Sequence, residues 1–86
     1  MNHLRYVVMR REAEWKIVRA GRRYSGSYPS KRQALCAAIE FAEQDGHAGL
    51  RVEVLVRHED GNFLTEWAFG RDLPSRLMRI MVRRNS

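Results

Sequence analysis

The sequence lacks several features that large classes of protein require. Its 86 residues contain one cysteine and two prolines, and no apolar run approaches the length of a membrane span. The lone Cys36 excludes an internal disulfide framework and fits a reducing cytosol. The first residues, MNHLRYVVMRR, lack the apolar core of a signal peptide. We therefore expect a cytoplasmic protein of bacterial type with no membrane partner.

Patterns that carry catalysis or bind metals are also missing. The three histidines have neither a second histidine four residues away nor a cysteine companion, so no zinc site is expected. Cys36 has no histidine nearby in sequence and is expected to be a free thiol rather than a nucleophile. His58, Glu59 and Asp60 are adjacent, but a hairpin turn is a poor place to hold an acid–base pair. We expect no enzyme activity, no metal and no cofactor.

Length and composition predict a single globular domain. A chain of 86 residues has no room for a second core. Its hydrophobic content of 44% and charged content of 30% are those of an ordinary folded protein. The pattern divides the chain into a domain over residues 1–72 and a basic amphipathic tail over residues 73–86, which begins near Pro74 and forms either a helix to about Val82 or a disordered end.

The N-terminal third predicts three short antiparallel strands. Leu4–Arg10 is rich in aromatic and β-branched residues, and Glu14–Ala20 alternates between apolar and polar positions. Gly21 permits a tight turn into a third strand, Arg23–Tyr28. Gly26 within that strand indicates a bulge or a close approach of another backbone. Because the connections are short, a meander is the economical arrangement.

An amphipathic helix is expected after Pro29. Ser30 and Gln33 match the S-x-x-Q capping box, and Gly46 is the expected left-handed residue at the helix end. The helical wheel gathers the small and large apolar residues on one face: Ala34, Leu35, Ala38, Ile39, Phe41 and Ala42.

A second hairpin follows the helix. Val52, Val54 and Val56 alternate with Glu53, Leu55 and Arg57, and Glu59-Asp60-Gly61-Asn62 predicts a tight turn. The returning strand, Asn62–Phe69, is expected to present Phe63, Thr65, Trp67 and Phe69 on one face. The predicted fold class is α+β: a small antiparallel sheet of a three-stranded meander and a hairpin, one capped helix, and a short C-terminal helix if the tail folds.

Basic residues concentrate in the first part of the chain. Residues 1–32 contain nine Lys/Arg against two Glu, whereas residues 33–72 contain more acids than bases. This asymmetry fits either a polyanionic partner or an ordinary solvated surface.

The order of motifs resembles a family of short bacterial proteins that is defined as a domain of unknown function. The resemblance spans about residues 5–72, and what it implies is the strand–helix order without an assigned activity. It rests on Tyr6-Val7-Val8, Trp15 to Ile17, Gly21 to Arg23, Ser30 to Ala34, Ala38 to Ala42, Asp60-Gly61 and Trp67 to Gly70.

A second resemblance covers only Trp15–Glu43. This stretch is similar to the arm-type DNA-binding domain of phage-integrase-like tyrosine recombinases, in which a three-stranded sheet lies in the major groove. The chain has no recombinase catalytic domain, and its second hairpin has no counterpart there. Carried over by position, the residues that the resemblance implies for nucleic-acid binding are Lys16, Arg19, Arg22, Arg23, Ser25 and Ser27.

Two hypotheses for function follow. In the first, the protein binds nucleic acid through a basic platform on the sheet face opposite the helix, to which Arg5, Arg10 and Arg11 would also contribute. In the second, it is a protein-interaction or self-assembly module, such as a homodimer, that pairs through an exposed strand edge or the C-terminal amphipathic segment.

Overall fold

The structure, a computed structural model, describes residues 3–19 and 22–72, with only the backbone of residues 22–25. The turn expected at Gly21 and the tail 73–86, including the helix expected there, lie outside the described residues.

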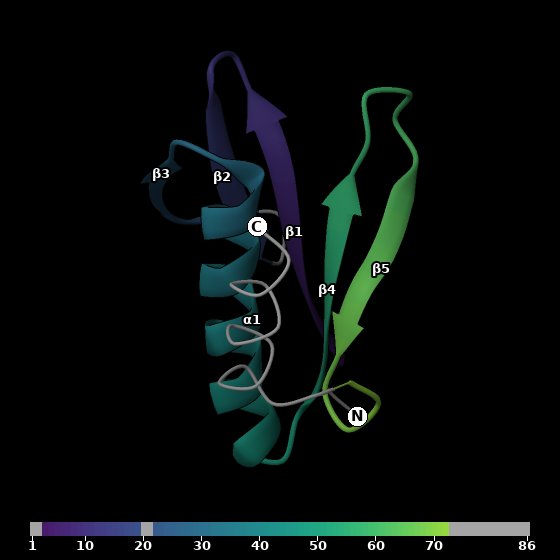
Figure 1. Ribbon diagram of the computed structural model, residues 1–86. Coiled ribbons are helices and arrows are strands. Elements are labelled where there is room, and N and C mark those ends of the chain that lie inside the picture. Colours follow the sequence, from purple (N-terminus) through teal and green to yellow (C-terminus); the bar gives the residue numbers. More distant parts are fainter. Residues whose placement is uncertain (1–2, 20–21, 73–86) are drawn as a thin grey trace, which may run out of the picture.

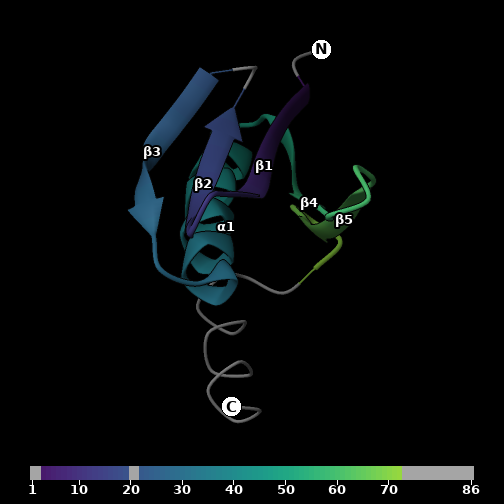
Figure 2. The same cartoon turned by 90° about the horizontal axis from the view of Figure 1, so that it is seen from above.

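The described chain forms one helix against one five-stranded sheet, which confirms the α+β class (Figure 1). The spatial order of the strands is β3-β2-β1-β4-β5, and the helix lies on one side of the sheet (Figure 2). The elements are β1 (His3–Arg11), β2 (Glu14–Arg19), β3 (Arg22–Tyr28), α1 (Lys31–His47), β4 (Arg51–Arg57) and β5 (Phe63–Ala68).

The sheet is mixed, so the expectation of a purely antiparallel sheet was wrong. β1 and β4 are parallel neighbours, paired from His3–Arg51 to Val8–Val56. The reason is the helix: α1 carries the chain back along the sheet, so β4 starts at the same end as β3 and runs parallel to β3 and β1. The three-stranded meander and the second hairpin are antiparallel, as predicted.

The core lies between α1 and the sheet. Ala34, Ala38 and Ala42 are fully buried, so the helix approaches the strands closely, as its alanine face predicted. Larger side chains come from the strands, with Tyr6, Val8, Ile17, Val54, Val56 and Trp67 among the most buried. Leu35 and Phe41 pack against this cluster from the helix.

Both ends of α1 are capped, though not entirely as the sequence suggested. The Ser30 hydroxyl accepts a bond of 3.2 Å from the Gln33 amide, which confirms the predicted N-cap. The Gln33 side chain bonds the Ser30 hydroxyl rather than its backbone N–H. At the other end the left-handed residue is Gly49, with φ 95°, because the helix continues through Gly46. The Gly49 and Leu50 amides bond the carbonyls of Gly46 and Asp45, the pattern of a Schellman cap.

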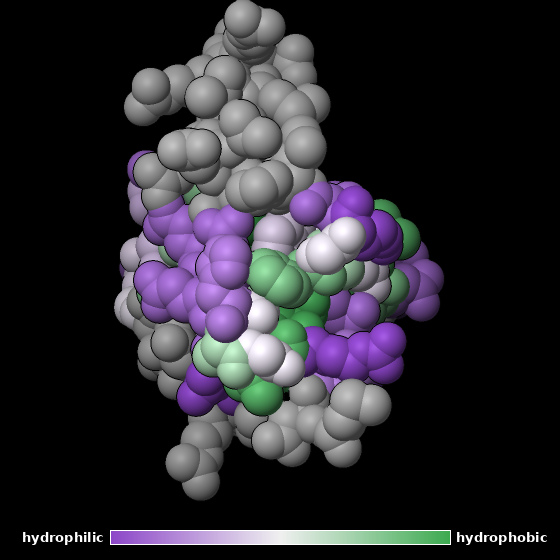
Figure 3. Space-filling view, turned by 90° about the horizontal axis from the view of Figure 1, so that it is seen from below, coloured by the Kyte–Doolittle hydropathy of each residue, from purple (hydrophilic) through white to green (hydrophobic). Residues whose placement is uncertain are grey.

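Gly46 has a packing role instead. It is buried inside the helix, and a methyl group on it would overlap the ring of Phe69, which follows β5. His47 contacts the same ring edge-on, with centroids 5.2 Å apart. Seen from this end of the molecule, hydrophobic residues gather in the middle and hydrophilic residues surround them (Figure 3).

A bulge in β5 overturns the face predicted for that strand. Val54 pairs with Trp67, but Leu55 pairs with Thr65, so Glu66 is an extra residue. Trp67 is consequently 1% exposed in the core, whereas Phe63 is 53% exposed on the opposite side of the sheet. Strict alternation cannot reveal this, because an inserted residue reverses the phase.

The irregularity predicted at Gly26 is present as a register shift in the β2–β3 ladder, between the pairs Lys16–Ser27 and Val18–Arg23. The alternative interpretation, a close backbone approach, does not hold, since no atom lies within 4 Å of the position that a methyl group on Gly26 would occupy.

Within residues 3–19 and 22–72, no helix is long and apolar enough to cross a membrane.

The contact between Gly46 and Phe69 gives a stability prediction. Gly46→Ala should lower the free energy of unfolding by about 1–3 kcal/mol, because the added methyl group displaces the ring. Gly26→Ala is the matched control and should change it by less than about 1 kcal/mol, since the site is open. Urea denaturation measures both. If the Gly46→Ala cost persists in a Phe69→Ala background, the overlap is not its cause.

Candidate functional site

The sheet face turned away from α1, called the outer face, carries most of the described basic strand residues. Strand alternation and register place five Lys/Arg and two Glu there: Arg5, Arg11, Lys16, Arg51, Arg57, Glu14 and Glu53. Two of the five cations, Arg51 and Arg57, come from the second hairpin. Their alternation with Val52, Val54 and Val56 was visible in the sequence, but only the parallel pairing of β4 with β1 joins them to the N-terminal cations.

Lys16 and Ser27, two of the six predicted site residues, are neighbours on the outer face. The Lys16 ammonium group donates to the Ser27 hydroxyl and lies 3.3 Å from a Glu14 carboxylate oxygen. A hydrogen bond from Ser27, then the hydrogen bond and charge of Lys16, hold the pKa of Glu14 below its ordinary value. The Lys16 side chain is only 16% exposed, and its charge is paired with that of Glu14.

Arg19 lies on the opposite side of the sheet from Lys16. Its ladder partner is the fully buried Tyr6, and its guanidinium carbon lies 5.9 Å from the centroid of the Tyr6 ring. Arg19 Nη1 is 3.9 Å from Asp45 Oδ2 at the end of α1, and Tyr6 donates its hydroxyl to that same oxygen. Arg19 therefore links the sheet to the helix and does not join the outer face.

The other three predicted residues, Arg22, Arg23 and Ser25, belong to β3 by their backbone, but their side chains lie outside the described part. Arg10, expected among the flanking cations, lies on the helix side, because its ladder partner is Trp15 and Trp15 packs against the core. Arg5 does lie on the outer face, where its Nε bonds Glu53 at 2.8 Å.

The middle of the outer face is apolar. Val7 on β1 pairs with Val18 on β2 and with Leu55 on β4, so three apolar residues lie side by side. All three side chains are half-buried. Phe63 continues this surface onto β5, where it pairs with Arg57. The sequence did not predict that Phe63 and Arg57 share the outer face. The β5 bulge, which places Phe63 on the opposite face from Trp67, has no clear sequence signal.

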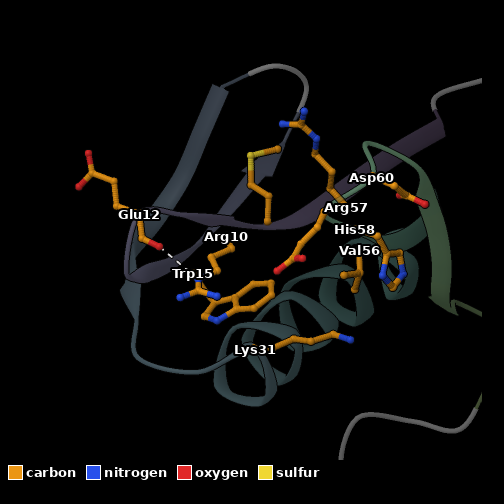
Figure 4. Close-up of a pocket in the computed structure, with 10 residues that line it drawn as sticks. Arg10, Glu12, Trp15, Lys31, Val56, Arg57, His58 and Asp60 are labelled. Atoms are coloured by element: carbon orange, nitrogen blue, oxygen red, sulfur yellow. Dashed lines mark hydrogen bonds between the residues drawn. The ribbon is translucent and has the colours of Figure 1, made fainter.

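A second surface feature is a crevice between the two hairpin tips, with a volume of ≈ 820 Å³. It lies where β1 and β4 separate and where α1 begins (Figure 1). Figure 4 shows Trp15 and Lys31 on one side and Val56, His58 and Asp60 on the other. The complete lining is Met9, Arg10, Glu12, Trp15, Lys31, Val56, Arg57, His58, Glu59 and Asp60. The sequence does not reveal the crevice, because its lining comes from three separate stretches of the chain, residues 9–15, 31 and 56–60.

Among the described residues, no three His, Cys, Asp or Glu side chains are grouped so that they could hold a metal ion. Cys36 is a free, half-buried thiol.

Comparison with known proteins leaves the resemblances untested: no protein-family model, no curated protein and no solved structure matches the chain. The likeness to the family of unknown function and the likeness to integrase arm domains therefore stay predictions.

The Tyr6–Asp45–Arg19 network can be tested by a double-mutant cycle. Tyr6→Phe should lower the free energy of unfolding by about 1–3 kcal/mol, because it leaves a carboxylate oxygen with one fewer donor. Asp45→Asn should cost a similar amount, because the neutral amide oxygen is a weaker acceptor and the charge facing Arg19 is lost. The double variant should cost less than the sum, since both changes act on the Tyr6–Asp45 bond. Asp60→Asn in the β4–β5 turn, far from the network in sequence, is the control for additivity with Tyr6→Phe. Strict additivity of Tyr6→Phe with Asp45→Asn would contradict the network.

Proposed function

We propose that the protein binds single-stranded nucleic acid across the outer face of its sheet. The observation that carries this proposal is the combination of five Lys/Arg, two Glu and an exposed aromatic ring, Phe63, on a sheet face that no element of the described residues covers. Basic side chains attract phosphates, and an exposed ring can stack on a base of any sequence.

The width of the sheet favours a single strand over a duplex. Five strands at about 4.8 Å spacing span about 19 Å, whereas the major groove is about 12 Å wide. The sheet therefore does not enter the groove as the integrase resemblance implies. A single strand can lie across the sheet instead, with its phosphates toward Arg5, Arg11 and Arg57 and a base toward Phe63.

The ion pairs on the outer face set the expected strength of nucleic-acid binding. Arg5 and Lys16 are already paired with Glu53 and Glu14, so they attract phosphates less than free cations would. With about three to five effective contacts, log K should fall with log salt at a slope of about −2 to −3.5. Binding is therefore expected at low salt and should weaken steeply toward physiological salt.

A binding titration with matched charge variants tests the proposal. Fluorescence anisotropy with a labelled oligothymidine should show tighter binding than with a duplex of equal length. Arg5→Gln with Arg57→Gln should weaken binding by about tenfold or more and reduce the salt slope by about 1.4, the share of two contacts. Lys31→Gln with Arg32→Gln removes the same net charge from the start of α1 and should have little effect. Phe63→Leu should also weaken binding, since base stacking is lost.

Two outcomes would overturn the proposal. One is the absence of binding at about 20 mM salt, where phosphate contacts are strongest. The other is an equal loss in both double variants, which would mean that net charge rather than the outer face governs binding.

A second candidate, self-association through β5, is favoured by a different observation. β5 is an edge strand, and Phe63 and Leu64 at its start are 53% and 55% exposed. An unpaired edge with exposed apolar residues can pair with the same edge of a second copy. The Glu66 bulge limits such pairing to the first half of the strand.

Sedimentation velocity over a range of concentrations tests this candidate. A dimer is expected, and Leu64→Lys should dissociate it, because a charge at the edge opposes pairing. Gln44→Lys, which adds the same charge to an exposed site on α1, should leave it intact. A monomer at the highest concentration would exclude self-association.

A further inference from the structure

The crevice lies at a position where the topology of a sheet creates a binding site. β1 and β4 are parallel neighbours, and their shared ladder ends at Val8–Val56. Beyond it, β1 turns toward β2 and β4 turns toward β5, on opposite sides. In α/β sheets, ligands bind at the carboxyl ends of parallel strands where the chain departs in opposite directions. The same geometry arises here within a mixed sheet.

The size and the apolar part of the crevice fit a small molecule. Its ≈ 820 Å³ fall within the range of about 300–1,000 Å³ that small-molecule sites occupy. Trp15 is half-buried, with part of its indole against the core and part lining the crevice. Val56 and Met9 complete the apolar lining. A flat apolar group can therefore lie against the indole.

Two cations that line the crevice come from different elements, Arg10 from β1 and Lys31 from α1. Arg10 is the ladder partner of Trp15. The Nε of Arg10 donates to the Glu12 carbonyl at 3.1 Å, and this bond orients the guanidinium group. The two Nη groups of Arg10 make no bond with any described residue. Lys31, in the first turn of α1, forms no ion pair with any described residue. That turn contains no acidic residue, so the positive end of the helix dipole adds to these charges.

Two of the three lining carboxylates, those of Glu12 and Asp60, are directed or bonded elsewhere. The Glu12 side chain points away from the crevice (Figure 4). Both carboxylate oxygens of Asp60 accept bonds from Asn62, at 2.9 and 3.0 Å, within the β4–β5 turn. Glu59 belongs to that same turn. Glu59 also lines the crevice, so its carboxylate is the negative charge that a bound ligand would meet there.

We propose that the crevice binds a small organic anion, with its flat apolar body against Trp15 and its carboxylate or phosphate group at Lys31, which extends toward Val56 and His58 (Figure 4). Arg10 and the helix dipole add positive potential. This site is distinct from the outer face, although Met9 and Arg57 belong to both.

A titration followed by ¹H–¹⁵N NMR spectra tests the site with defined probes. Phenyl phosphate and benzoate combine a ring with an anion of the two candidate types; inorganic phosphate supplies the anion alone, and benzylamine supplies a ring with the opposite charge. Phenyl phosphate or benzoate should give saturable shifts of the Trp15 indole N–H and of the amides of residues 10, 31 and 58. Inorganic phosphate should bind at least tenfold more weakly and benzylamine not at all.

Variants locate the two halves of the site. Lys31→Gln should weaken binding of the better ring anion by about tenfold, the loss of one hydrogen bond to a charged group. Arg32→Gln, in the same helical turn but exposed and outside the lining, is the matched control and should leave it unchanged. Trp15→Leu should weaken the ring anions without changing inorganic phosphate.

The proposal is wrong if neither ring anion gives saturable shifts at about 20 mM, a concentration that would detect even millimolar affinity. It is equally wrong if the shifts centre on outer-face residues, if benzylamine binds as tightly as the anions, or if Arg32→Gln and Lys31→Gln weaken binding equally. Failure at the crevice does not decide nucleic-acid binding, which is measured separately by the oligothymidine affinity of variants at Arg5, Arg57 and Phe63.

Discussion

The hydrogen bond from Tyr6 to Asp45 joins the middle of the sheet to the last turn of the helix, and the arrangement of both layers depends on it. Tyr6 is fully buried, so its hydroxyl would cost about 1–3 kcal/mol if left without a partner. Asp45 supplies that partner from a position where the helix dipole disfavours an acid, and Arg19 offsets the unfavourable charge. With the helix held there, Gly46 meets Phe69, and the Schellman cap at Gly49 directs the chain into β4 beside β1.

Holding the helix on one face divides the polar residues of the first hairpin between two environments. Arg19 lies between sheet and helix, close to Asp45 of α1, whereas Lys16 lies on the outer face with Glu14 and Ser27. The two ends of α1 differ as well. Its C-terminal end is closed by the Tyr6 network and the Phe69 contact, but its N-terminal end opens onto the crevice, because β1 and β4 separate there. Within the described residues, one packing arrangement thus leaves the outer face of the sheet and the N-terminal end of α1 without a covering element.

Much of the local structure was predictable, because it depends on neighbours in sequence. The Ser30 cap, the alanine face of the helix, the alternation of Val52, Val54 and Val56, and the Asp60-Gly61 turn all follow from short-range patterns. Errors arose where a distant contact decides the outcome. Gly46 was assigned to the helix end because its packing against Phe69 is not visible locally, and Phe63 was assigned inward because the bulge at Glu66 depends on pairing with β4.

The sequence by itself determined the α+β class, the order of the elements and the concentration of positive charge near the N-terminus, since propensity, capping and composition act over a few residues. Only the tertiary structure decided which of those charges share a surface. Arg19 leaves the predicted site because its neighbour across the ladder is the buried Tyr6, while Arg57 joins the outer face through the parallel pairing of β4 with β1. Strand order and register depend on how α1 crosses the sheet, and no spacing of residues within one strand encodes that path.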